Sequence, residues 1–520
     1  MKIKAKKQAK RMEKKESVTS QVIKNSFWNF LMGLFAKAGG LIFVIILARL
    51  LLPEKFGIYN LAMTITLLLA TFADFGINQT LIRYFAEALG KGRKKLAVAR
   101  YRYLFKLKFL LTFSLSIFLL IFAYPLSIYI FKKPALFLPL LFLSIYLFIS
   151  CFELFYKSFF YVLEKVGYIT IKQALFETAR IVLILIFFLL ISTQYEVLGA
   201  VGILTVSVSI ALIYSLYNLK RLTPFLFEKS KGSLKREEKK RINKFLVYMG
   251  IGDTSAIIFG YIDIVMIGLF LSSEYVGFYS AAWALSSGFA VLFSIAYILL
   301  PVFTKLKRQR LNEAFNKVVK YISIVTLPII FGIFVLGKYI IRIIYGYEYL
   351  PATLPLYFLA FLIIEKPLTG CLTSLFSARE KPKYFVYILA IATLMNIVLN
   401  YILILSLLKI SMTWAISGAA IATLISRGFY LFGLSIYSKK QLNLRFSITP
   451  VIKSLFSASV MALILFLINT QLTDITLIIG IGEVVLGALI YLLIMIIIGG
   501  IKKQDFELLK ILKPKFYNRE

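Results

Sequence analysis

The chain has 520 residues, of which 60% are hydrophobic, and it carries a formal net charge of +37. The apolar fraction exceeds that of an average soluble domain, so much of the chain needs lipid to cover it. In a soluble protein this charge would indicate nucleic acid, but the basic residues here fall between apolar runs, which argues against a nucleic-acid partner.

The residue types limit the chemistry further. The chain has no histidine, which excludes histidine-based triads, metal sites and proton relays. Its two cysteines, Cys151 and Cys371, lie in apolar runs and indicate neither a disulfide framework nor a metal site. The chain contains no G-x-x-x-x-G-K-[ST] pattern, so it does not hydrolyse ATP by a P-loop. We expect no cofactor and no metal.

Residues 1–24 form a basic segment before the first apolar run. The segment is too basic and too long for a cleavable signal peptide, and no small-residue cleavage site follows. We expect a cytoplasmic tail, which either lies on anionic lipid head groups or is simply solvated.

Fourteen apolar segments follow the tail. A bilayer core needs roughly 20 apolar residues per helix, and each segment approaches or exceeds this length. They cover residues 26–51, 58–82, 103–125, 135–162, 167–192, 196–219, 245–271, 276–302, 318–341, 350–377, 384–408, 412–437, 450–470 and 475–500. The pattern predicts an all-α integral membrane protein with about fourteen transmembrane helices.

The distribution of lysine and arginine predicts the orientation, because basic connections stay on the cytoplasmic side. With the N-terminus in the cytoplasm, the inner connections hold roughly 50 of the 61 basic residues. The main inner segments are the tail, 83–108, 220–244, 305–320 and the C-tail, whereas the outer loops 192–196, 272–277 and 470–474 contain none. We expect both termini in the cytoplasm and a multi-pass protein of the cell membrane.

This topology divides the chain into five predicted parts. The longest hydrophilic connection, about 220–244, is a basic linker too short for a soluble catalytic domain. The parts are a tail (1–24), an N-lobe of six spans (25–220), the linker (221–243), a C-lobe of six spans (244–438) and the last two spans with a basic tail (439–520).

The two lobes share an internal repeat. Residues 51–62 read LLPEKFGIYNLA and residues 271–282 read LSSEYVGFYSAA, so Leu, Glu, Gly, Tyr and Ala coincide at an offset of 220. Six spans separate the copies, and an even number gives both lobes the same orientation. Two parallel lobes with a site between them is a transporter layout. The alternative is a shared solution for a hairpin turn, in which glycine relaxes the turn and glutamate caps the next helix.

Several motifs resemble a known family. Residues 48–59 (ARLLLPEKFGIY) and 72–76 (FADFG) with 81–84 (LIRY) resemble the first hairpin of the polysaccharide-biosynthesis flippases. Residues 263–268 (DIVMIG), 276–279 (VGFY) and Pro301 continue the likeness in the second lobe. The chain is similar to O-antigen translocases of the multidrug/oligosaccharidyl-lipid/polysaccharide exporter superfamily. The resemblance implies a twelve-helix core in two pseudo-symmetric lobes plus two C-terminal helices.

Four basic residues fall at middle depths of predicted spans, namely Lys37, Arg180, Lys366 and Arg427. A charge at bilayer depth is costly, so it usually faces a wet cavity or a partner. A lipid-linked sugar carries a phosphate or diphosphate, which fixed cations bind electrostatically. We predict that these four bind the anion. The alternative is local pairing, since Glu177 and Arg180 share a helix face.

Two further arginines, Arg49 and Arg83, lie at span ends, where they either contact substrate or extend to the head groups. Local sequence also predicts two bends. Gly39 and Gly40 follow Lys37, and Pro367 follows Lys366.

Membrane carboxylates are candidates for coupling transport to H⁺ or Na⁺, because a buried carboxyl can hold a proton or coordinate a cation. The candidates are Asp74, Asp253, Asp263 and Glu177. The alternative is that they brace helices by pairing with nearby cations, above all Asp74 and Asp263, which lie in the family motifs.

The sequence thus predicts a flippase. It would move a polyprenyl phosphate- or diphosphate-linked oligosaccharide from the inner to the outer leaflet by alternating access, for the assembly of a surface polysaccharide or other glycan. Expected partners are the lipid-linked oligosaccharide, membrane lipids, H⁺ or Na⁺, and glycan-assembly enzymes.

Two other classes remain as alternatives. One is an ion-coupled multidrug or metabolite antiporter of the same superfamily, for which twelve spans and a more acidic cavity would suit better. The other is a membrane glycosyltransferase or polymerase, which needs sizeable outer loops. The outer loops here are short and carry no D-x-D or E-x-D pair, so we expect a transporter rather than an enzyme.

Overall fold

The structure is a computed structural model that describes residues 2–190, 195–228, 234–292, 308–379, 383–472, 476–502 and 505. Within these ranges the regular elements are all helices. This agrees with the predicted all-α class and follows from lipid as solvent, because a helix satisfies its own backbone groups.

The long helices follow the predicted spans closely. They are α1 (Lys2–Asp74), α2 (Ile77–Gly90), α3 (Lys94–Pro125), α4 (Phe137–Val162), α5 (Val166–Leu190), α6 (Glu196–Leu222), α7 (Arg236–Phe270), α8 (Ser273–Leu292), α10 (Arg308–Tyr345), α11 (Thr353–Leu359), α12 (Leu362–Ala378), α13 (Lys383–Leu408), α14 (Met412–Leu442), α15 (Thr449–Asn469) and α16 (Leu477–Ile497). Short helical turns join some of them, such as Leu126–Ile130 and Tyr347–Ala352.

Among the described residues, 11 helices are long and apolar enough to cross a membrane, or up to 12 if one bent pair is a single span. The stretch Leu31–Gly90 counts once in this number although it contains two predicted spans. The predicted span 276–302 begins in α8 and continues beyond Leu292, outside the described residues. The number fourteen therefore stays a prediction.

Three helix breaks occur in or next to the first, second and tenth predicted spans. In α1, Leu52 has φ 58 and ψ 169 and precedes Pro53, so two helices meet there. The second predicted span is interrupted before α2, where Gly76 has φ 77, a conformation that glycine adopts at little cost. The tenth span is the pair Tyr347–Leu359 and Leu362–Ala378, bent by 40°.

The bend of the tenth span differs from its predicted position. It lies between α11 and α12, whereas Pro367 lies inside the continuous helix α12. Proline cannot donate to the carbonyl four residues earlier, so the preceding turn loses a hydrogen bond and the distortion falls on the N-terminal side.

Many hydroxyl side chains inside the spans donate to a carbonyl of the preceding turn. Thr66 donates to the Ala62 carbonyl at 2.8 Å, and the Ser207 hydroxyl donates to the carbonyl of Ile203 at 2.7 Å. This pattern recurs along the helices and satisfies hydroxyl groups that lipid cannot hydrate.

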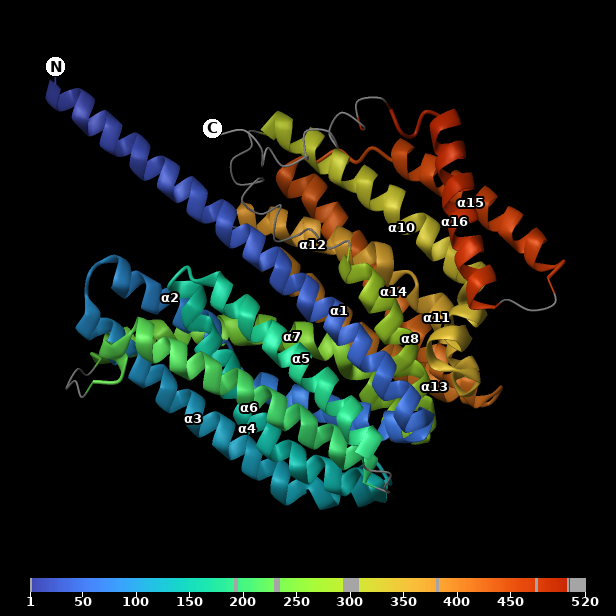
Figure 1. The fold of residues 1–520 in the computed structure, drawn as a ribbon, viewed down its shortest axis with the longest axis horizontal. Coiled ribbons are helices and arrows are strands. Elements are labelled where there is room, and N and C mark those ends of the chain that lie inside the picture. Colours follow the sequence, from blue (N-terminus) through green and yellow to red (C-terminus); the bar gives the residue numbers. More distant parts are fainter. Residues whose placement is uncertain are drawn as a thin grey trace. The chain divides into compact units, whose positions relative to one another are not determined.

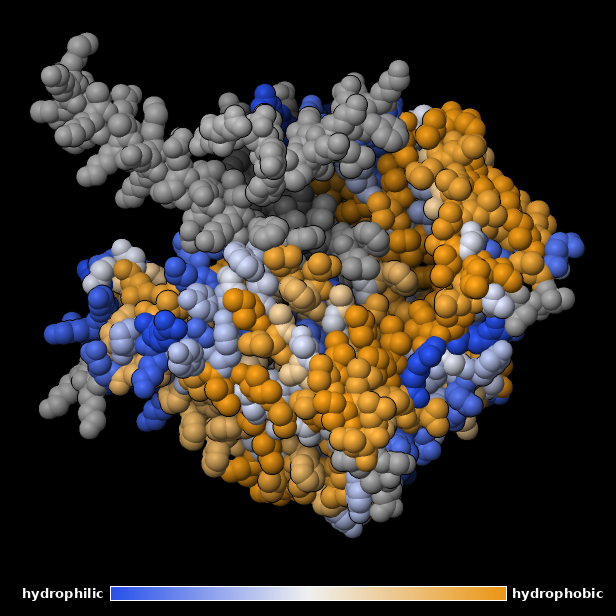
Figure 2. Space-filling model, in the orientation of Figure 1, coloured by the Kyte–Doolittle hydropathy of each residue, from blue (hydrophilic) through white to orange (hydrophobic). Residues whose placement is uncertain are grey.

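The chain divides into two compact units. One contains Met1–Ala284 and Leu389–Thr423, and the other contains Leu285–Ile388 and Leu424–Glu520. In the first unit α1 packs against α5, and α4 packs against α6; in the second, α10 packs against α15 (Figure 1). Apolar side chains dominate the visible faces of α3 to α6 and of α15 and α16 (Figure 2), as lipid contact requires.

Contacts between connections agree with the predicted membrane sides. Arg100, in the predicted inner connection 83–108, donates to the Glu238 carboxylate of α7 at 2.8 Å. On the predicted outer side, Lys55 contacts Glu196 at 2.8 Å. These contacts join inner to inner and outer to outer connections. The orientation itself stays a prediction.

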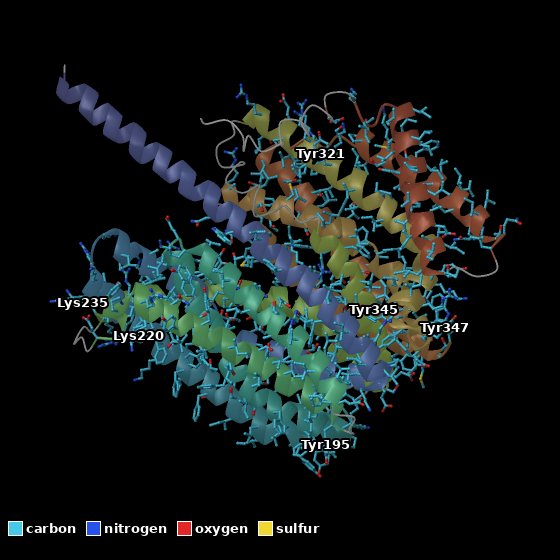
Figure 3. All side chains as sticks on the ribbon, viewed as in Figure 1. Tyr195, Lys220, Lys235, Tyr321, Tyr345 and Tyr347 are labelled. Carbon is cyan, nitrogen blue, oxygen red and sulfur yellow. The ribbon has the colours of Figure 1, made fainter. Side chains whose placement is uncertain are left out.

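The C-terminal residue that the structure describes, Asp505, is held on α10. It accepts hydrogen bonds from Lys320 at 2.6 Å and from the hydroxyl of Tyr321 at 2.7 Å. Tyr321 is labelled on α10 in Figure 3. Burial alone would raise the pKa of Asp505, but these bonds and one from the Lys502 amide lower it below its usual value. The contact joins two segments that were both predicted to lie inside.

The matched glycines of the internal repeat meet each other. A Cβ on Gly57 would lie 1.7 Å from the carbonyl oxygen of Ser273, and a Cβ on Gly277 would lie 2.1 Å from that of Pro53. Both pairs obey the offset of 220, because Ser273 corresponds to Pro53 and Gly277 to Gly57. A reciprocal contact of this kind is expected where a two-fold axis relates two copies. It favours duplication over a shared turn motif. We call Pro53, Gly57, Ser273 and Gly277 together the glycine interlock.

Lys133 adds a polar contact near the glycine interlock. Its ammonium donates to the Gly268 carbonyl at 2.5 Å, close to the C-terminal end of α7. A cation is favourable at a helix C-terminus. Burial lowers the pKa of Lys133.

Gly277→Ala should lower the free energy of unfolding by about 1–3 kcal/mol, because the added methyl overlaps a backbone carbonyl that cannot move alone. Gly260→Ala in α7 is the matched control, since a Cβ there meets nothing within 4 Å. Thermal unfolding in detergent measures both. Equal unfolding temperatures for Gly277→Ala and the unchanged protein would contradict the close approach.

Candidate functional site

In the first unit, the predicted cation Arg180 lies on α5 beside α1. It forms an ion pair with Glu177, with Nε donating to Oε2 at 2.7 Å, and Gln173 donates to the other carboxylate oxygen at 2.8 Å. A Cβ on Gly39 would lie 2.8 Å from Glu177, and one on Gly40 would lie 3.4 Å from the Arg180 guanidinium. The two glycines therefore admit the charged pair against α1, and α1 continues through them unbroken.

Aromatic rings surround the Arg180 guanidinium. Its Cζ lies 4.5 Å from the ring centroid of Phe43 and 5.0 Å from that of Phe176. Tyr59 and Tyr146 lie within electrostatic range. Cation–π contacts hold the guanidinium without neutralising it.

Lys37 lies on α1 one turn before Gly40, and its side chain is partly buried. Of the predicted cations, Lys37 and Arg180 belong to this unit, and both lie along the packed surface of α1 and α5.

The structure adds two lysines that the sequence analysis did not select. Lys172 on α5 forms an ion pair with Glu153 of α4 at 2.7 Å, and both side chains are nearly fully buried. Lys157, one turn after Glu153, lies within electrostatic range of both residues. The sequence does show that each of these lysines lies inside a predicted span, near one end of it.

In the second unit, Lys366 and Arg427 come together around one carboxylate. Arg427 contacts Glu365 at 3.3 Å, and Lys366 donates to the hydroxyl of Ser287 at 2.8 Å. Lys366 also lies within electrostatic range of Arg427 and Glu365, and Tyr430 lies nearby. Two cations share one fully buried carboxylate, so the cluster carries a net positive charge.

The two span-end arginines are both exposed. Arg83 places its guanidinium 4.3 Å from the ring centroid of Phe245 on α7. Arg49 lies on α1, one turn before the break at Leu52. Their predicted contact with substrate stays a prediction.

Two candidate carboxylates lie near each other in the first unit. Asp74, at the end of α1, accepts a hydrogen bond from the fully buried Lys108 at 2.7 Å. Asp253 on α7 is exposed and within electrostatic range of Asp74. This contact with Lys108 is the kind of pairing that we expect if Asp74 braces helices.

Asp263 is the most enclosed of the four carboxylates, with 1% of its surface exposed. It accepts hydrogen bonds from Tyr279 at 2.6 Å, from Asn400 at 2.7 Å and from Thr423 at 2.5 Å. Asn396 donates to Thr423 at 3.3 Å. The amide oxygens of Asn396 and Asn400 are buried and accept no hydrogen bond from the residues that the structure describes.

This Asp263 cluster is rich in oxygen atoms. The cluster contains the Asp263 carboxylate on α7, the amide oxygens of Asn396 and Asn400 on α13, and the Thr423 hydroxyl on α14. The two amide oxygens are buried and accept no hydrogen bond from the described residues. Hard cations such as Na⁺ prefer oxygen ligands of these types. Both interpretations of Asp263, ion coupling and the bracing of helices, stay predictions.

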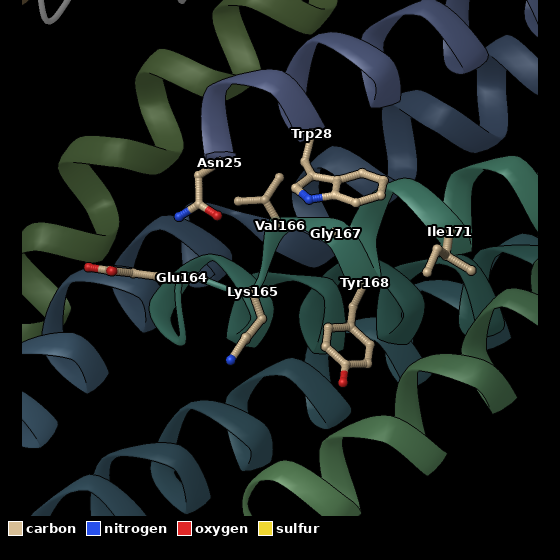
Figure 4. A pocket seen from close by; sticks show the side chains of 8 residues that line it. All are labelled: Asn25, Trp28, Glu164, Lys165, Val166, Gly167, Tyr168 and Ile171. Carbon is tan, nitrogen blue, oxygen red and sulfur yellow. The ribbon is translucent and has the colours of Figure 1, made fainter. Parts of the chain in front are cut away.

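An open pocket of about 260 Å³ lies at the other end of the first unit, lined by Asn25, Trp28, Glu164, Lys165, Val166, Gly167, Tyr168 and Ile171. Asn25 and Trp28 come from α1 and the others from the start of α5 and the turn before it (Figure 4). The Thr170 hydroxyl donates to the Trp28 carbonyl at 2.8 Å and joins the two helices there.

These features define a class of protein. Buried cations, carboxylates and amides lie on membrane-length helices, and the described residues contain no cluster of His, Cys, Asp and Glu suited to a metal ion. Such sites bind and release charged solutes, so the chain is a multi-pass membrane transport protein.

The chain belongs to the polysaccharide biosynthesis protein family, whose family model matches residues 22–307, more than half of the chain. The resemblance predicted from the hairpin motifs is thereby confirmed.

Known proteins support this assignment. The probable low-salt glycan biosynthesis flippase Agl15 of Haloferax volcanii is 26% identical over 314 residues, which cover 58% of this chain and 65% of that protein. The chain thus matches just under two thirds of that relative's length.

Among solved structures, the lipid II flippase MurJ in an inward closed conformation has a TM-score of 0.72 at 17% identity, covering 92% of this chain and 98% of that one. An inward-facing multidrug resistance MATE transporter of the MOP superfamily has a TM-score of 0.54 at 16% identity, covering 80% and 96%. These likenesses confirm the predicted fold class. The named relatives are flippases and transporters, which agrees with the prediction of a transporter rather than an enzyme.

Glu365→Ala should lower the free energy of unfolding by about 3–5 kcal/mol, because it leaves two buried cations without their shared carboxylate. Adding Arg427→Leu should restore most of the loss. Thermal unfolding of both variants measures the effect, with Glu348→Ala, an exposed glutamate of the same unit, as control. A double variant no more stable than Glu365→Ala would contradict the shared-charge interpretation.

Proposed function

We propose that this protein is a flippase for a lipid-linked oligosaccharide, carried on a polyprenyl phosphate or diphosphate and destined for a surface polysaccharide or other glycan. The observation that supports this most is the set of buried cations inside the spans, above all the cluster around Glu365, where Arg427 and Lys366 lie close to one carboxylate. A phosphate group is the part of such a substrate that a membrane interior rejects most strongly, and fixed cations lower that cost. Family membership and the glycan flippase among its relatives support the same substrate class.

Transport would proceed by alternating access. The glycine interlock supports this step, since it brings together the predicted outer ends of α1 and α8. A head group entering from the inside would be released outside only after these ends separate. The small contact surface of four backbone groups keeps the cost of separation low. We place the protein in the cell membrane, where such substrates are made and used.

The drive for transport would be a Na⁺ gradient acting through the Asp263 cluster. The two buried amide oxygens without donors support this choice, because a bound cation would satisfy both. H⁺ is less suited, because protonated Asp263 would still leave those oxygens without a donor. Asp74, Asp253 and Glu177 remain secondary candidates.

A multidrug or metabolite antiporter of the same superfamily is the second candidate, and the MATE likeness favours it. Such an antiporter binds cationic substrates, so it needs carboxylates that a substrate is able to reach. In the described residues, Asp253 is such a group. The excess of buried cations in the other clusters favours the flippase.

Translocation in proteoliposomes tests the proposal. Protein would be reconstituted with a labelled polyprenyl-diphosphate oligosaccharide, and access of an outside glycosidase to the label would be timed. Lys37→Ala and Arg427→Ala should each slow flipping roughly tenfold or more, since a charge-assisted hydrogen bond contributes about 1.5–3 kcal/mol. Lys409→Ala, an exposed lysine at a helix end, is the control.

Two results would decide against the flippase. The first is an unchanged flipping rate in both variants. The second is the absence of flipping by the unchanged protein, together with export of cationic dyes under an ion gradient, which would establish the antiporter.

Na⁺ binding should be visible as stabilisation. At a Na⁺ concentration of about 100 times the Kd, the free energy of unfolding of the unchanged protein should be about 2.7 kcal/mol higher than in the same concentration of K⁺. Asp263→Asn, which keeps the shape and removes the charge, should abolish the gain, and Asp253→Asn should retain it. A Na⁺ effect that survives Asp263→Asn would show that the cation binds elsewhere.

A further inference from the structure

Lys157 has no role in the site described so far. It lies on α4 inside a membrane-length helix and is partly exposed. It forms no hydrogen bond or ion pair with the residues that the structure describes. Its nearest charges are Lys172, which repels it, and Glu153, whose carboxylate is already engaged by Lys172 at 2.7 Å. Two cations therefore share one anion.

An ammonium without a counter-ion is costly at membrane depth. Lys172 and Glu153 form an ion pair at 2.7 Å and are almost wholly buried, whereas the neighbouring Lys157 is partly exposed. The excess charge is thus concentrated on a side chain that a ligand is able to reach. An anion with several oxygen acceptors is the complementary ligand.

A continuous polar series leads away from this point along α5. Lys172 donates to Gln173 at 3.3 Å, Gln173 donates to Glu177 at 2.8 Å, and Arg180 pairs with Glu177. Lys172 and Arg180 are eight residues apart, which is about 12 Å along a helix. A phosphate held at Lys157 would therefore have a second cation within one short displacement.

The position suits a substrate arriving from inside. Lys157 and Lys172 lie near the ends of α4 and α5 that meet at the turn 163–165, a predicted inner connection. The open pocket of about 260 Å³ includes this turn and Ile171, the residue before Lys172. The pocket and Lys157 therefore lie toward the same end of α4 and α5.

We propose that Lys157, supported by the Lys172–Glu153 pair, is a loading site for the phosphate or diphosphate group of a polyprenyl-linked substrate, occupied before the anion reaches Arg180. This inference rests on the proposed flippase function and deepens it. It assigns the first contact to the inner ends of α4 and α5.

Binding to the full-length protein in nanodiscs of zwitterionic lipid tests the site. The probes are a fluorescent short-chain polyprenyl diphosphate and the matching polyprenol, with inorganic diphosphate and an anionic phospholipid as competitors. Lys157→Gln should raise the Kd for the diphosphate probe roughly tenfold or more, as expected for a lost charge-assisted hydrogen bond. Lys157→Arg should restore binding, and Lys95→Gln, an exposed lysine of another predicted inner connection, should bind normally.

The polyprenol probe and the two competitors show which part of the ligand is bound. Polyprenol affinity should be the same in all variants. Inorganic diphosphate or anionic phospholipid that competes as well as the polyprenyl diphosphate would assign the site to a free anion or bulk lipid and overturn the loading role. An unchanged Kd in Lys157→Gln, or failure of Lys157→Arg to bind, would also overturn it.

The outcome is separable from that of the proposed function. A protein that binds polyprenyl diphosphate through Lys157 but flips no oligosaccharide would keep this site and lose the flippase assignment. A protein that flips normally with Lys157→Gln at saturating and at limiting substrate would keep the flippase and lose the loading site.

Discussion

An ionised side chain inside a membrane must have its charge compensated by the protein, and this constraint organises the whole structure. Lys108 pairs with Asp74, Lys172 with Glu153, Arg180 with Glu177 and Arg427 with Glu365. Three of these pairs join different helices and so help to fix which helices pack together, whereas Arg180 and Glu177 lie on the same helix. Cations outnumber carboxylates around Glu365, and buried amide oxygens without a donor lie around Asp263.

Glycine serves the same constraint by letting helices approach. Gly39 and Gly40 make room on α1 for a charged pair that a larger residue would exclude. Gly57 and Gly277 allow two helix ends to meet backbone to backbone, at a point related by the internal repeat. The first pair of glycines therefore accommodates a buried charged pair, and the second allows a close backbone contact.

The fold and the candidate site differ in how far the sequence predicts them. The apolar runs and basic connections predict the all-helical class, the span positions and the family, because lipid imposes a local requirement on each segment. Helix breaks are less predictable. Pro367 led us to expect a bend at that residue, yet the bend lies before α12, since the distortion falls on the turn that the proline fails to bond. We selected the candidate anion-binding residues by their predicted depth in the bilayer, which depends on sequence position alone. Lys157 and Lys172 lie near the ends of their spans and were therefore not selected.

The sequence by itself determined the membrane class, the number and order of apolar segments, the repeat and the presence of charges at bilayer depth. Each of these depends on composition within one segment or on a comparison of segments. Only the tertiary structure decided that Glu365 forms an ion pair with Arg427, that Asp263 meets Asn400 and Thr423 from distant helices, and that Lys172 rather than Lys157 forms the ion pair with Glu153. The physical reason is that pairing depends on which helix faces pack together, and residues 60 to 160 positions apart in the chain meet only after the bundle forms.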